Sequence, residues 1–503
     1  MTLPAWLDPL FDAREMRAAD AWAIEEQGVP GLDLMERAGA ALARAAARLA
    51  GRERVLVVVG KGNNGGDGLV AARLLREEGR EVEVVAAVPL EGASGDAAAN
   101  LERLPGEPPR EWDGRPLPPA GVVVDALLGT GFTGVPREPL AGLIAAVNAH
   151  PAPVVACDVP SGVDAATGEV HGEAVRADLT VTFHGPKIGL HVWPGAEHAG
   201  EVEVAEIGIP RGAPTAQTAG LITDRVLGLV PARPRFGSKF TSGTVVVAGG
   251  SLGLTGAPAM AARAAMRAGA GYVQLAVPAS TQLVFEIQLT ESMTHALPER
   301  DGAHVPEGAE RVAELAERAG AVVLGPGIGR SEGAFAFARE VARRVPAPLV
   351  LDADGLNAHA GDLEALRERP GPTVLTPHAG ELARLLGTDS DDVAAHRLAC
   401  ARAAAERSGC VVLLKGDDTI VAQPGRPVAV SPGATPALAT AGTGDVLSGV
   451  IAAFLAKGLG AFEAAAAGVL AHARAGREAA ARVGADHTVA GDVIDALCVA
   501  LKR

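Results

Sequence analysis

Short apolar runs alternate with longer amphipathic segments along the first 210 residues. The runs at 54–59, 82–86, 122–126 and 154–158 are rich in valine, and the first leads through a glycine loop into the helix-like segment 69–75. Strands that are apolar at every position belong to sheets buried on both faces, and their alternation with helices is typical of parallel sheets. Ligands bind such sheets outside the carboxyl ends of the strands. We therefore expect a site where these runs end.

A second series of apolar runs starts after a break in composition. Residues 211–237 are rich in proline, glycine, alanine and threonine, which is typical of linkers. Five further strand-like runs follow at 243–250, 321–324, 348–351, 373–375 and 410–414. The two halves share no motif, so we infer no internal duplication. The pattern predicts two α/β domains, with boundaries at 1–212 for the first, 213–222 for a linker and 223–503 for the second.

The composition fits a soluble globular chain of more than one domain. The sequence has 503 residues, of which 48% are hydrophobic and 21% charged, and a single core rarely grows to this length. No apolar stretch approaches the ~20 residues of a membrane span. The N-terminus lacks the basic and apolar regions of a secretory signal. We expect a cytoplasmic protein.

Charge and cysteine content narrow the range of partners. The net charge of -15 argues against nucleic acid, because binding there depends on neutralising phosphates. The four cysteines (Cys157, Cys400, Cys410 and Cys498) include no C-x-x-C pair. They indicate reduced thiols, not a disulfide scaffold or a zinc site. Small anionic molecules remain candidate ligands, provided that local groups hold them.

The most informative motif lies near the C-terminus. Gly442-Thr443-Gly444-Asp445 leads into the apolar segment 446–454, which indicates a glycine-rich turn opening a buried helix. Free N–H groups at a helix start favour a phosphate or an oxyanion. Asp445 would repel a phosphate, but it suits a base that takes a proton from a hydroxyl. The motif indicates phosphoryl transfer to an alcohol, with an ordinary capped helix as the alternative.

A glycine loop and two acidic strand ends mark the first half. Residues 60–68 follow a strand and precede a helix, but they match neither a dinucleotide-binding motif nor a Walker A loop. Asp125 and Asp158 end two further strands, and Ser161 follows closely. Asn64, Asp125 and Ser161 could supply oxygen ligands to a cation. For any one of these acids alone, helix capping is the alternative.

These motifs resemble the YjeF N-terminal domain family, the NAD(P)H-hydrate epimerases. The resemblance covers roughly residues 10–210 and rests on the segments 62–68, 125–131 and 158–162 and on Pro186-Lys187. It implies a Rossmann-like three-layer domain that interconverts the R and S forms of hydrated NADH or NADPH.

The same resemblance implies roles for individual residues. Asn64, Asp125 and Ser161 would bind a potassium ion, and Asp158 would be the acid–base group with Lys187 as its partner. The residues lining the hydrate-binding site would be Asn63, Asn64, Gly65, Gly66, Asp67, Gly129, Thr130, Gly131, Phe132, Thr133, Gly134, Val135 and Asp158. Epimerisation at a carbinolamine-like carbon requires only ring opening, or loss and return of the oxygen. A carboxylate can shuttle that proton while a lysine polarises the oxygen.

The second half carries motifs in the order and spacing of another family. They lie at 238–243, 249–251, 325–329, 351–357, 375–381, 415–419 and 440–445. From about residue 220 onward the chain resembles the YjeF C-terminal family, the ADP/ATP-dependent NAD(P)H-hydrate dehydratases of the ribokinase-like superfamily. The resemblance implies a ribokinase-like α/β domain that uses ADP or ATP with magnesium.

This second resemblance also implies site residues. The hydrate would contact Ala257, Gly327, His378 and Asp445, with Asp445 accepting the hydroxyl proton. The nucleotide would contact Lys415, Gly416, Asp417, Asp418, Thr419 and Gly444. Family members commonly have small residues in place of Asp417 and Asp418. These two acids could face solvent, bind magnesium indirectly or tune the nucleotide preference.

The two halves together predict a bifunctional nicotinamide-hydrate repair enzyme. Hydroxide leaves poorly, so the ring hydroxyl is first phosphorylated and phosphate then departs, while the epimerase recycles the epimer that the dehydratase rejects. The expected partners are small molecules, with no nucleic acid and no membrane, and the resemblance implies a homo-oligomer. Two alternatives stay open: a small-molecule kinase of the ribokinase superfamily, and a first half that only binds or docks.

Overall fold

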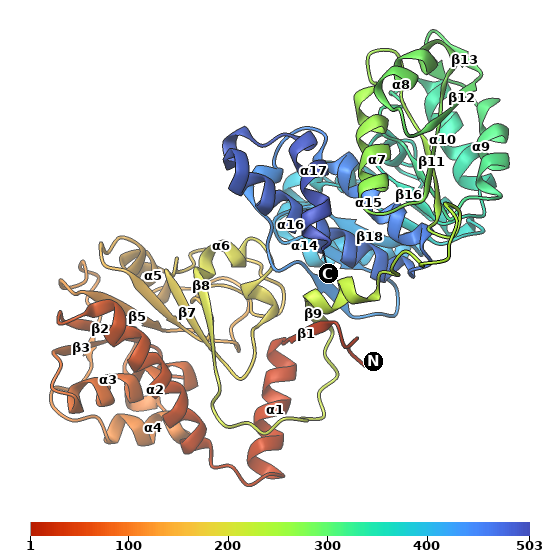
Figure 1. Ribbon diagram of the computed structural model, residues 1–503. Helices are drawn as coiled ribbons and strands as arrows, with labels where there is room; N and C mark the ends of the chain where they lie inside the picture. The colour runs from red at the N-terminus through yellow and green to blue at the C-terminus, as the bar shows by residue number, and fades with distance from the viewer. Residues whose placement is uncertain (1, 503) are drawn as a thin grey trace. The chain divides into compact units, whose positions relative to one another are not determined.

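The computed structural model describes residues 2–502, which form two compact units (Figure 1). The first unit contains Pro9–Gly220, and the second contains Pro4–Asp8 together with the chain from Leu221 onward. Within residues 2–502, every helix is too short or too polar to span a lipid bilayer.

The first unit is built on a parallel sheet of seven strands. In spatial order the strands are β4 (Arg110–Glu111), β3 (Val82–Ala86), β2 (Val55–Val59), β5 (Val122–Ala126), β6 (Val154–Cys157), β7 (Leu179–Phe183) and β8 (Glu201–Ala205). Every residue of β2, β5 and β6 is buried. The apolar runs of the sequence therefore form the centre of the sheet, and the predicted parallel α/β fold is confirmed.

Helices cover both faces of this sheet. They are α1 (Ala13–Glu25), α2 (Gly31–Ala50), α3 (Asn63–Glu77), α4 (Gly95–Glu102), α5 (Leu140–Asn148) and α6 (Gly195–Ala199). Val57 and its alternate neighbours pack with α2 and α3, whereas Leu56 and Val58 pack with α5. Successive strand residues point to opposite faces, so one apolar strand contributes to two cores. The predicted three-layer arrangement follows from this alternation.

The order of strands reverses at β2, which lies between β3 and β5. Such a reversal leaves a crevice at the carboxyl ends of the two strands, where α/β proteins bind ligands. The glycine loop after β2 lies at this crevice and packs tightly. A Cβ atom on Gly60 would lie 2.2 Å from the carbonyl oxygen of Leu127, and one on Gly65 would lie 1.9 Å from that of Gly60. Only glycine fits at these two positions.

The second unit contains a sheet of eleven strands. In spatial order they are β1 (Leu7–Leu10), β9 (Ala219–Ile222), β20 (Val428–Val430), β19 (Ile420–Ala422), β18 (Val411–Leu414), β17 (Thr373–Leu375), β16 (Leu349–Leu351), β15 (Ala321–Leu324), β10 (Thr244–Ala248), β11 (Tyr272–Pro278) and β12 (Met293–Leu297). The strands from β18 to β12 run parallel, while β19 is antiparallel to both β18 and β20. A separate hairpin joins β13 (Glu299–Arg300) to β14 (Ala303–His304).

The helices of the second unit complete its layers. They are α7 (Gly256–Arg267), α8 (Gln282–Gln288), α9 (Gly308–Ala316), α10 (Glu332–Arg344), α11 (Asp354–Asn357), α12 (Ala379–Leu386), α13 (Ser390–Ala395), α14 (Arg397–Ser408), α15 (Thr443–Ala456), α16 (Ala461–Val483) and α17 (Ala490–Ala500). The strand order reverses at β10, which lies between β11 and β15. Glycine loops follow both β10 and β15, so this unit also has a ligand crevice of the kind described above.

The N-terminal segment belongs to the second unit. The backbone carbonyl of Trp6 accepts hydrogen bonds from the N–H and the hydroxyl of Thr223, at 3.1 and 2.8 Å. The Trp6 ring lies 5.6 Å from that of Phe462. Residues 4–8 thus leave the first unit, although the sequence pattern grouped all of 1–212 together. This segment is too short to show a strand-like alternation in the sequence. Its place is fixed by contacts with residues more than 200 positions away.

Candidate active sites

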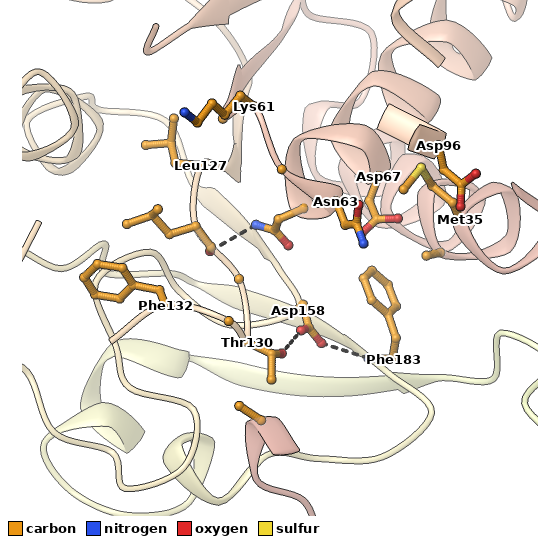
Figure 2. Close-up of a pocket in the computed structure, with 18 of the residues that line it drawn as sticks. Met35, Lys61, Asn63, Asp67, Asp96, Leu127, Thr130, Phe132, Asp158 and Phe183 are labelled. Carbon is orange, nitrogen blue, oxygen red and sulfur yellow. Dashed lines mark hydrogen bonds between the residues drawn. The ribbon is translucent and has the colours of Figure 1, made fainter. Parts of the chain in front are cut away.

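The first unit holds a cavity of about 1060 Å³ at the carboxyl ends of its central strands (Figure 2). Its walls come from α1, α2, the first turn of α3 and the loops after β2, β5 and β6. The residues expected at the hydrate site that line it are Asn63, Asn64, Asp67, Gly129, Thr130, Gly131, Phe132 and Asp158. Lys187 lines it as well. The fold therefore gathers residues from four segments into one space.

Other residues expected at the hydrate site have different surroundings. Gly65 packs on the backbone of Gly60, and a Cβ atom on Gly66 would lie 2.8 Å from the Met35 side chain. These two glycines shape the loop. Thr133, Gly134 and Val135 are not among the residues that line the cavity, and Val135 is 57% exposed.

Helix α1 contributes cavity residues that the sequence did not indicate. Met16, Arg17 and Asp20 all line the cavity from this helix. Burial raises the pKa of Asp20 to about 6; the charge of Lys187 opposes this shift and that of Asp158 adds to it. One acid on an amphipathic helix gives no local signal of a site, so only the fold identifies Asp20.

Asp158 and Lys187 form a buried ion pair. Lys187 Nζ donates to Asp158 Oδ1 at 2.5 Å, and also to Thr182 Oγ1 and the Phe183 carbonyl at 2.9 Å each. The Thr130 and Thr182 hydroxyls and the Phe183 N–H donate to the same carboxylate. Burial alone would raise the pKa of Asp158, but the charge and hydrogen bond of Lys187 outweigh it, so the pKa is lowered.

The backbone at Asp158 is strained as well as charged. Its φ of +67° lies in the left-handed region, which an L-residue other than glycine occupies at a cost of about 1–3 kcal/mol. The hydrogen bonds to its side chain hold the residue there. The result is an ionised carboxylate held in a fixed direction.

The three residues expected to bind potassium meet around the peptide of Leu128. Asp125 is fully buried and accepts from the Ser161 N–H at 2.8 Å and from the Ser161 hydroxyl at 2.6 Å. Asn64 donates through Nδ2 to the Leu128 carbonyl at 3.0 Å, and the Leu128 N–H donates to Ser161 Oγ at 2.9 Å. Burial raises the pKa of Asp125 to about 6, and the hydrogen bonds from Ser161 and Leu127 oppose the shift.

This donor set fits a monovalent cation. Among residues 2–502, the donors to the Asp125 carboxylate are the N–H groups of Leu127 and Ser161 and the Ser161 hydroxyl, so its buried negative charge lies among neutral groups. Within residues 2–502 there is no cluster of three or more histidine, cysteine or acidic side chains that could hold a metal. One carboxylate with hydroxyl, amide and carbonyl oxygens is a hard, weakly charged set.

In the second unit, Asp445 lies in the first turn of α15. The helix begins after Gly442, whose φ is +91°. The Thr443 hydroxyl donates to the carbonyls of Leu438 and Thr440, at 2.8 and 2.9 Å, and fixes the turn. Burial raises the pKa of Asp445 to about 7, and the charge of Asp352 adds to the shift. A carboxylate that titrates near neutral pH is matched to the task of a general base.

Lys415 lies between acidic groups beside this helix start. Its Nζ is 3.1 Å from Asp352 Oδ1 and 3.7 Å from Glu381 Oε2. It is also 3.4 Å from where a Cβ atom on Gly444 would stand. The Ser448 hydroxyl donates to Asp352 Oδ2 at 2.7 Å. The motifs containing Asp352, Glu381 and Ser448 were noted in the sequence, but nothing there assigned these residues to the site.

His378 caps α12 and does not point a charged ring at the site. Its Nδ1 accepts from the N–H groups of Gly380 and Glu381, at 3.0 and 3.4 Å, and the Glu381 side chain accepts from the His378 N–H at 2.9 Å. Burial lowers the pKa of His378, although Glu381 opposes this shift. The imidazole is therefore neutral at pH 7, which suits contact with an uncharged part of a ligand.

The two adjacent acids after Gly416 have separate structural roles. Asp418 is buried and forms an ion pair with Arg397 at 2.8 Å, and Arg397 also donates to the Lys415 carbonyl at 3.2 Å. Asp417 accepts from the Ala434 N–H at 2.8 Å. The carboxylate of Asp418 thus anchors the turn that carries Lys415, and none of the three expected explanations describes this role.

The remaining expected residues form the surrounding loops. The Thr419 hydroxyl donates to the Gly416 carbonyl at 2.6 Å and closes the turn after Lys415. Ser251, after β10, donates to the Gly327 carbonyl at 2.9 Å, which links the loops after β10 and β15. Ala257 is the second residue of α7.

Comparison with known proteins identifies the family. Two family models match: the YjeF-related protein N-terminus over residues 31–189, and the NAD(P)H-hydrate dehydratase over residues 245–498. The chain is 42% identical over 474 residues to the bifunctional NAD(P)H-hydrate repair enzyme Nnr of Salinibacter ruber, covering 88% of this chain and 86% of the relative. This chain belongs to the bifunctional NAD(P)H-hydrate repair enzymes.

One further member of this repair family and one solved structure are also similar to this chain. The enzyme of the same name from Moorella thermoacetica is 40% identical over 464 residues, covering 88% of this chain and 87% of the relative. Among solved structures, an ADP/ATP-dependent NAD(P)H-hydrate dehydratase from Bacillus subtilis, co-crystallized with ATP/Mg2+, is 27% identical. It covers 55% of this chain and 95% of that chain, with a TM-score of 0.48.

The two matched segments of this repair-family chain divide its two sites. The YjeF-related match contains Asp125, Asp158 and Lys187, and the dehydratase match contains Lys415 and Asp445. Helix α1, which carries Asp20, ends before the first match begins. The predicted membership in both YjeF families is confirmed.

Proposed function

We propose that this chain epimerises the R and S hydrates of NADH and NADPH and dehydrates the S-hydrate at the expense of ADP or ATP. One observation carries the proposal: each unit has its own set of groups that can move a proton. The first has Asp158 with Lys187 in the cavity, and the second has Asp445 at the start of α15. We assign epimerisation to the first unit and dehydration to the second.

Dehydration begins with the ring hydroxyl. Asp445 accepts its proton as the oxygen attacks the terminal phosphate of the nucleotide, and the N–H groups at the start of α15 hold the phosphoryl charge. Lys415, beside Gly444, supplies a compact positive charge to the phosphates. Phosphate is then a far better leaving group than hydroxide. Its departure, together with loss of a proton from the neighbouring ring carbon, restores the reduced nicotinamide ring.

We infer that Asp417 and Asp418 support this site through the backbone. The ion pair of Asp418 with Arg397 and the hydrogen bond from Arg397 to the Lys415 carbonyl fix the turn on which Lys415 stands. The nucleotide would then contact this turn through Lys415, Gly416 and Thr419. Magnesium would enter with the nucleotide beside this turn and would offset the negative charge of its phosphates.

Epimerisation takes place at a carbon that carries both the ring nitrogen and the hydroxyl. Asp158 accepts or returns the proton of that oxygen, and Lys187 keeps Asp158 ionised and directed into the cavity. The hydrate-binding site would be lined by Asn63, Asn64, Asp67 and the segment 129–132. A potassium ion held by Asn64, Asp125 and Ser161 would neutralise the buried charge of Asp125 and fix the loop after β5.

Product analysis of the purified full-length protein tests the proposal. The protein is incubated with S-hydrate and either ADP or ATP, and the products are separated. We expect free phosphate and the absorbance of reduced nicotinamide in equal amounts. A stable phosphorylated alcohol would instead identify a small-molecule kinase and contradict the proposal.

A further inference from the structure

The cavity of the first unit contains a second buried carboxyl group with no assigned task. Asp67 lies in the early part of α3, lines the cavity and is 9% exposed. Among residues 2–502, no hydrogen bond or ion pair reaches its side chain. Figure 2 shows Asp67 and Asp158 entering the same cavity from different elements. Its carboxyl oxygens are accessible from the cavity and not enclosed by protein, so a ligand in the cavity can reach them.

The surroundings of the two carboxyl groups are opposite in kind. Asp158 accepts hydrogen bonds from Thr130, Thr182, the Phe183 N–H and the Lys187 ammonium. These donors favour its ionised form. Asp67 has no such donor, and burial raises its pKa well above the ordinary range, with the charges of Asp158 and Asp20 adding to the shift. Two carboxyl groups whose environments separate their protonation states form an acid and a base at the same pH.

We propose that Asp67 is the proton donor of the epimerase site and that Asp158 is its proton acceptor across the hydrate. The inference rests on the proposed epimerase function and adds a second catalytic residue to it. The family resemblance implied only that Asp67 is one of many residues lining the hydrate-binding site.

The reaction balances with these two groups alone. The Asp67 carboxyl gives its proton to the ring hydroxyl, the carbon–oxygen bond breaks, and the lone pair of the ring nitrogen forms a carbon–nitrogen double bond. One water molecule leaves. A water molecule then adds to the opposite face of that carbon, and its extra proton passes to the Asp158 carboxylate. The product is the other epimer; Asp67 is now ionised and Asp158 protonated, and proton exchange with solvent restores both.

The charged and titratable groups around Asp67 are consistent with a protonated acid. Asp20 on α1 and Asp96 on α4 are further carboxyl groups at the cavity. The Cys157 thiol at the end of β6 is a neutral neighbour, since burial raises its pKa. Lys187 is the cation that opposes the shift of Asp67, and its ammonium is already bound to Asp158. Of the charges that act on Asp67, those of Asp158 and Asp20 raise its pKa and that of Lys187 lowers it. Arg17, Lys61, Arg137 and Glu138 also line the cavity.

The test is epimerisation by the full-length protein without nucleotide, so that no dehydration occurs. The R and S hydrates are separated, and the amount of each is measured over time at pH values from 6 to 9. Asp67→Asn keeps the shape of the side chain and removes the proton, and we expect its kcat to fall by about 10²–10⁴-fold with little change in KM. The rate of the unchanged protein should fall at alkaline pH as Asp67 loses its proton. The residual rate of Asp67→Asn should lack that fall.

Two further variants and a spectrum complete the test. Asp67→Glu retains the acid and should recover part of the rate together with the alkaline fall. Asp33→Asn changes an exposed carboxylate that does not line the cavity, and its rate should equal that of the unchanged protein. The infrared carbonyl band of a protonated carboxylic acid at pH 7 should be present in the unchanged protein and weaker in Asp67→Asn.

The outcomes separate this inference from the function on which it rests. No epimerisation by the unchanged protein contradicts the proposed function itself. An active unchanged protein with an Asp67→Asn rate within twofold of it overturns the role of Asp67, as does an alkaline fall that persists in Asp67→Asn. If Asp67→Asn does not fold, the pH profile of Asp67→Glu decides: an alkaline fall like that of Asp33→Asn supports a proton donor, and a flat profile overturns it.

Discussion

The Lys415 ammonium lies 3.1 Å from Asp352 Oδ1, and the other oxygen of Asp352 accepts a 2.7 Å hydrogen bond from Ser448. Ser448 lies one turn after Asp445 on α15. Asp352 therefore links Lys415 to α15, the helix that carries Asp445. It is 1% exposed, so its charge acts on its neighbours through a poorly screened medium.

This link predicts the pH dependence of dehydration. Burial raises the pKa of Asp445 to about 7, and Asp352 adds to the shift. A base must be ionised to act, so the dehydration rate should rise through about pH 7. Asp352→Asn removes one of the charges that disfavour ionisation, and the midpoint of this rise should move to lower pH.

Ser448→Ala is the matched comparison for Asp352→Asn. It removes the hydrogen bond to Asp352 and leaves the charge in place, so the midpoint should shift much less than in Asp352→Asn. The measurement is kcat/KM for the S-hydrate between pH 5.5 and 9. An unchanged midpoint in Asp352→Asn would show that Asp352 does not act on the base.

Asp445→Asn should separate the two activities. The amide cannot accept the hydroxyl proton, so dehydration should fall by about 10²–10⁴-fold. Epimerisation takes place in the other unit and should remain unchanged. Both rates are measured on the same preparation, and near-normal dehydration would refute the assignment of the base.

The same substitution should stabilise the protein in a pH-dependent way. The pKa of Asp445 is raised from 3.8 in the unfolded chain to about 7 in the folded protein. The contribution of such a group to stability is complete below about pH 4 and is lost as pH rises through 7, because the folded state must then bury a charge. Asp445→Asn should therefore melt a few degrees above the unchanged protein at pH 8 and at nearly the same temperature at pH 4.

Asp486→Asn provides the control for this effect. Asp486 is exposed in the same unit, and its replacement should not change the melting temperature at either pH. Equal melting curves of Asp445→Asn and the unchanged protein at pH 8 would mean that Asp445 carries no burial penalty.

The ion pair of Arg397 and Asp418 should matter more for stability than for chemistry. Both side chains are 7% exposed, and their charged groups lie 2.8 Å apart. Arg397→Met removes the guanidinium from a buried carboxylate and should cost about 3–5 kcal/mol of unfolding free energy. The double change Arg397→Met with Asp418→Leu should recover most of it. Chemical denaturation provides the measurement, and a loss below about 1 kcal/mol in the single variant, the scale of an exposed pair, would exclude a structural role.

The turn that this pair anchors carries Lys415, so nucleotide binding provides a second measurement. We expect the KM for the nucleotide to rise in Arg397→Met, because the hydrogen bond from Arg397 to the Lys415 carbonyl is lost. The kcat should change less. A KM equal to that of the unchanged protein would show that the turn keeps its position without Arg397.

The sequence predicted the strands and their acidic ends because both are local features. The valine runs before Asp125 and Asp158 form buried strands as expected, and the parallel order brings the ends together at one crevice. Lys187 was expected only from the resemblance. Its contact with Asp158 joins residues 29 positions apart and depends on the neighbouring position of β6 and β7.

Features that depend on distant contacts were not predicted. The hydrogen bond from Ser448 to Asp352 spans 96 positions, and that from Thr223 to Trp6 spans 217. Asp20 reaches the cavity because of where α1 packs, and no motif surrounds it. The buried pair of Asp418 with Arg397 was missed for the same reason, since an acid beside a glycine turn has the pattern of a surface residue.

The central claim, two independent sites in one chain, is tested most directly with the R-hydrate. The purified protein is given R-hydrate with ADP or ATP, and the appearance of reduced nicotinamide is compared with spontaneous epimerisation. We expect the unchanged protein to exceed the spontaneous rate. The Asp158→Asn protein should consume R-hydrate at the spontaneous rate while still dehydrating S-hydrate normally. Mixing it with the separate Asp445→Asn protein, which still epimerises, should restore R-hydrate consumption. Loss of S-hydrate dehydration in a folded Asp158→Asn protein would contradict the account.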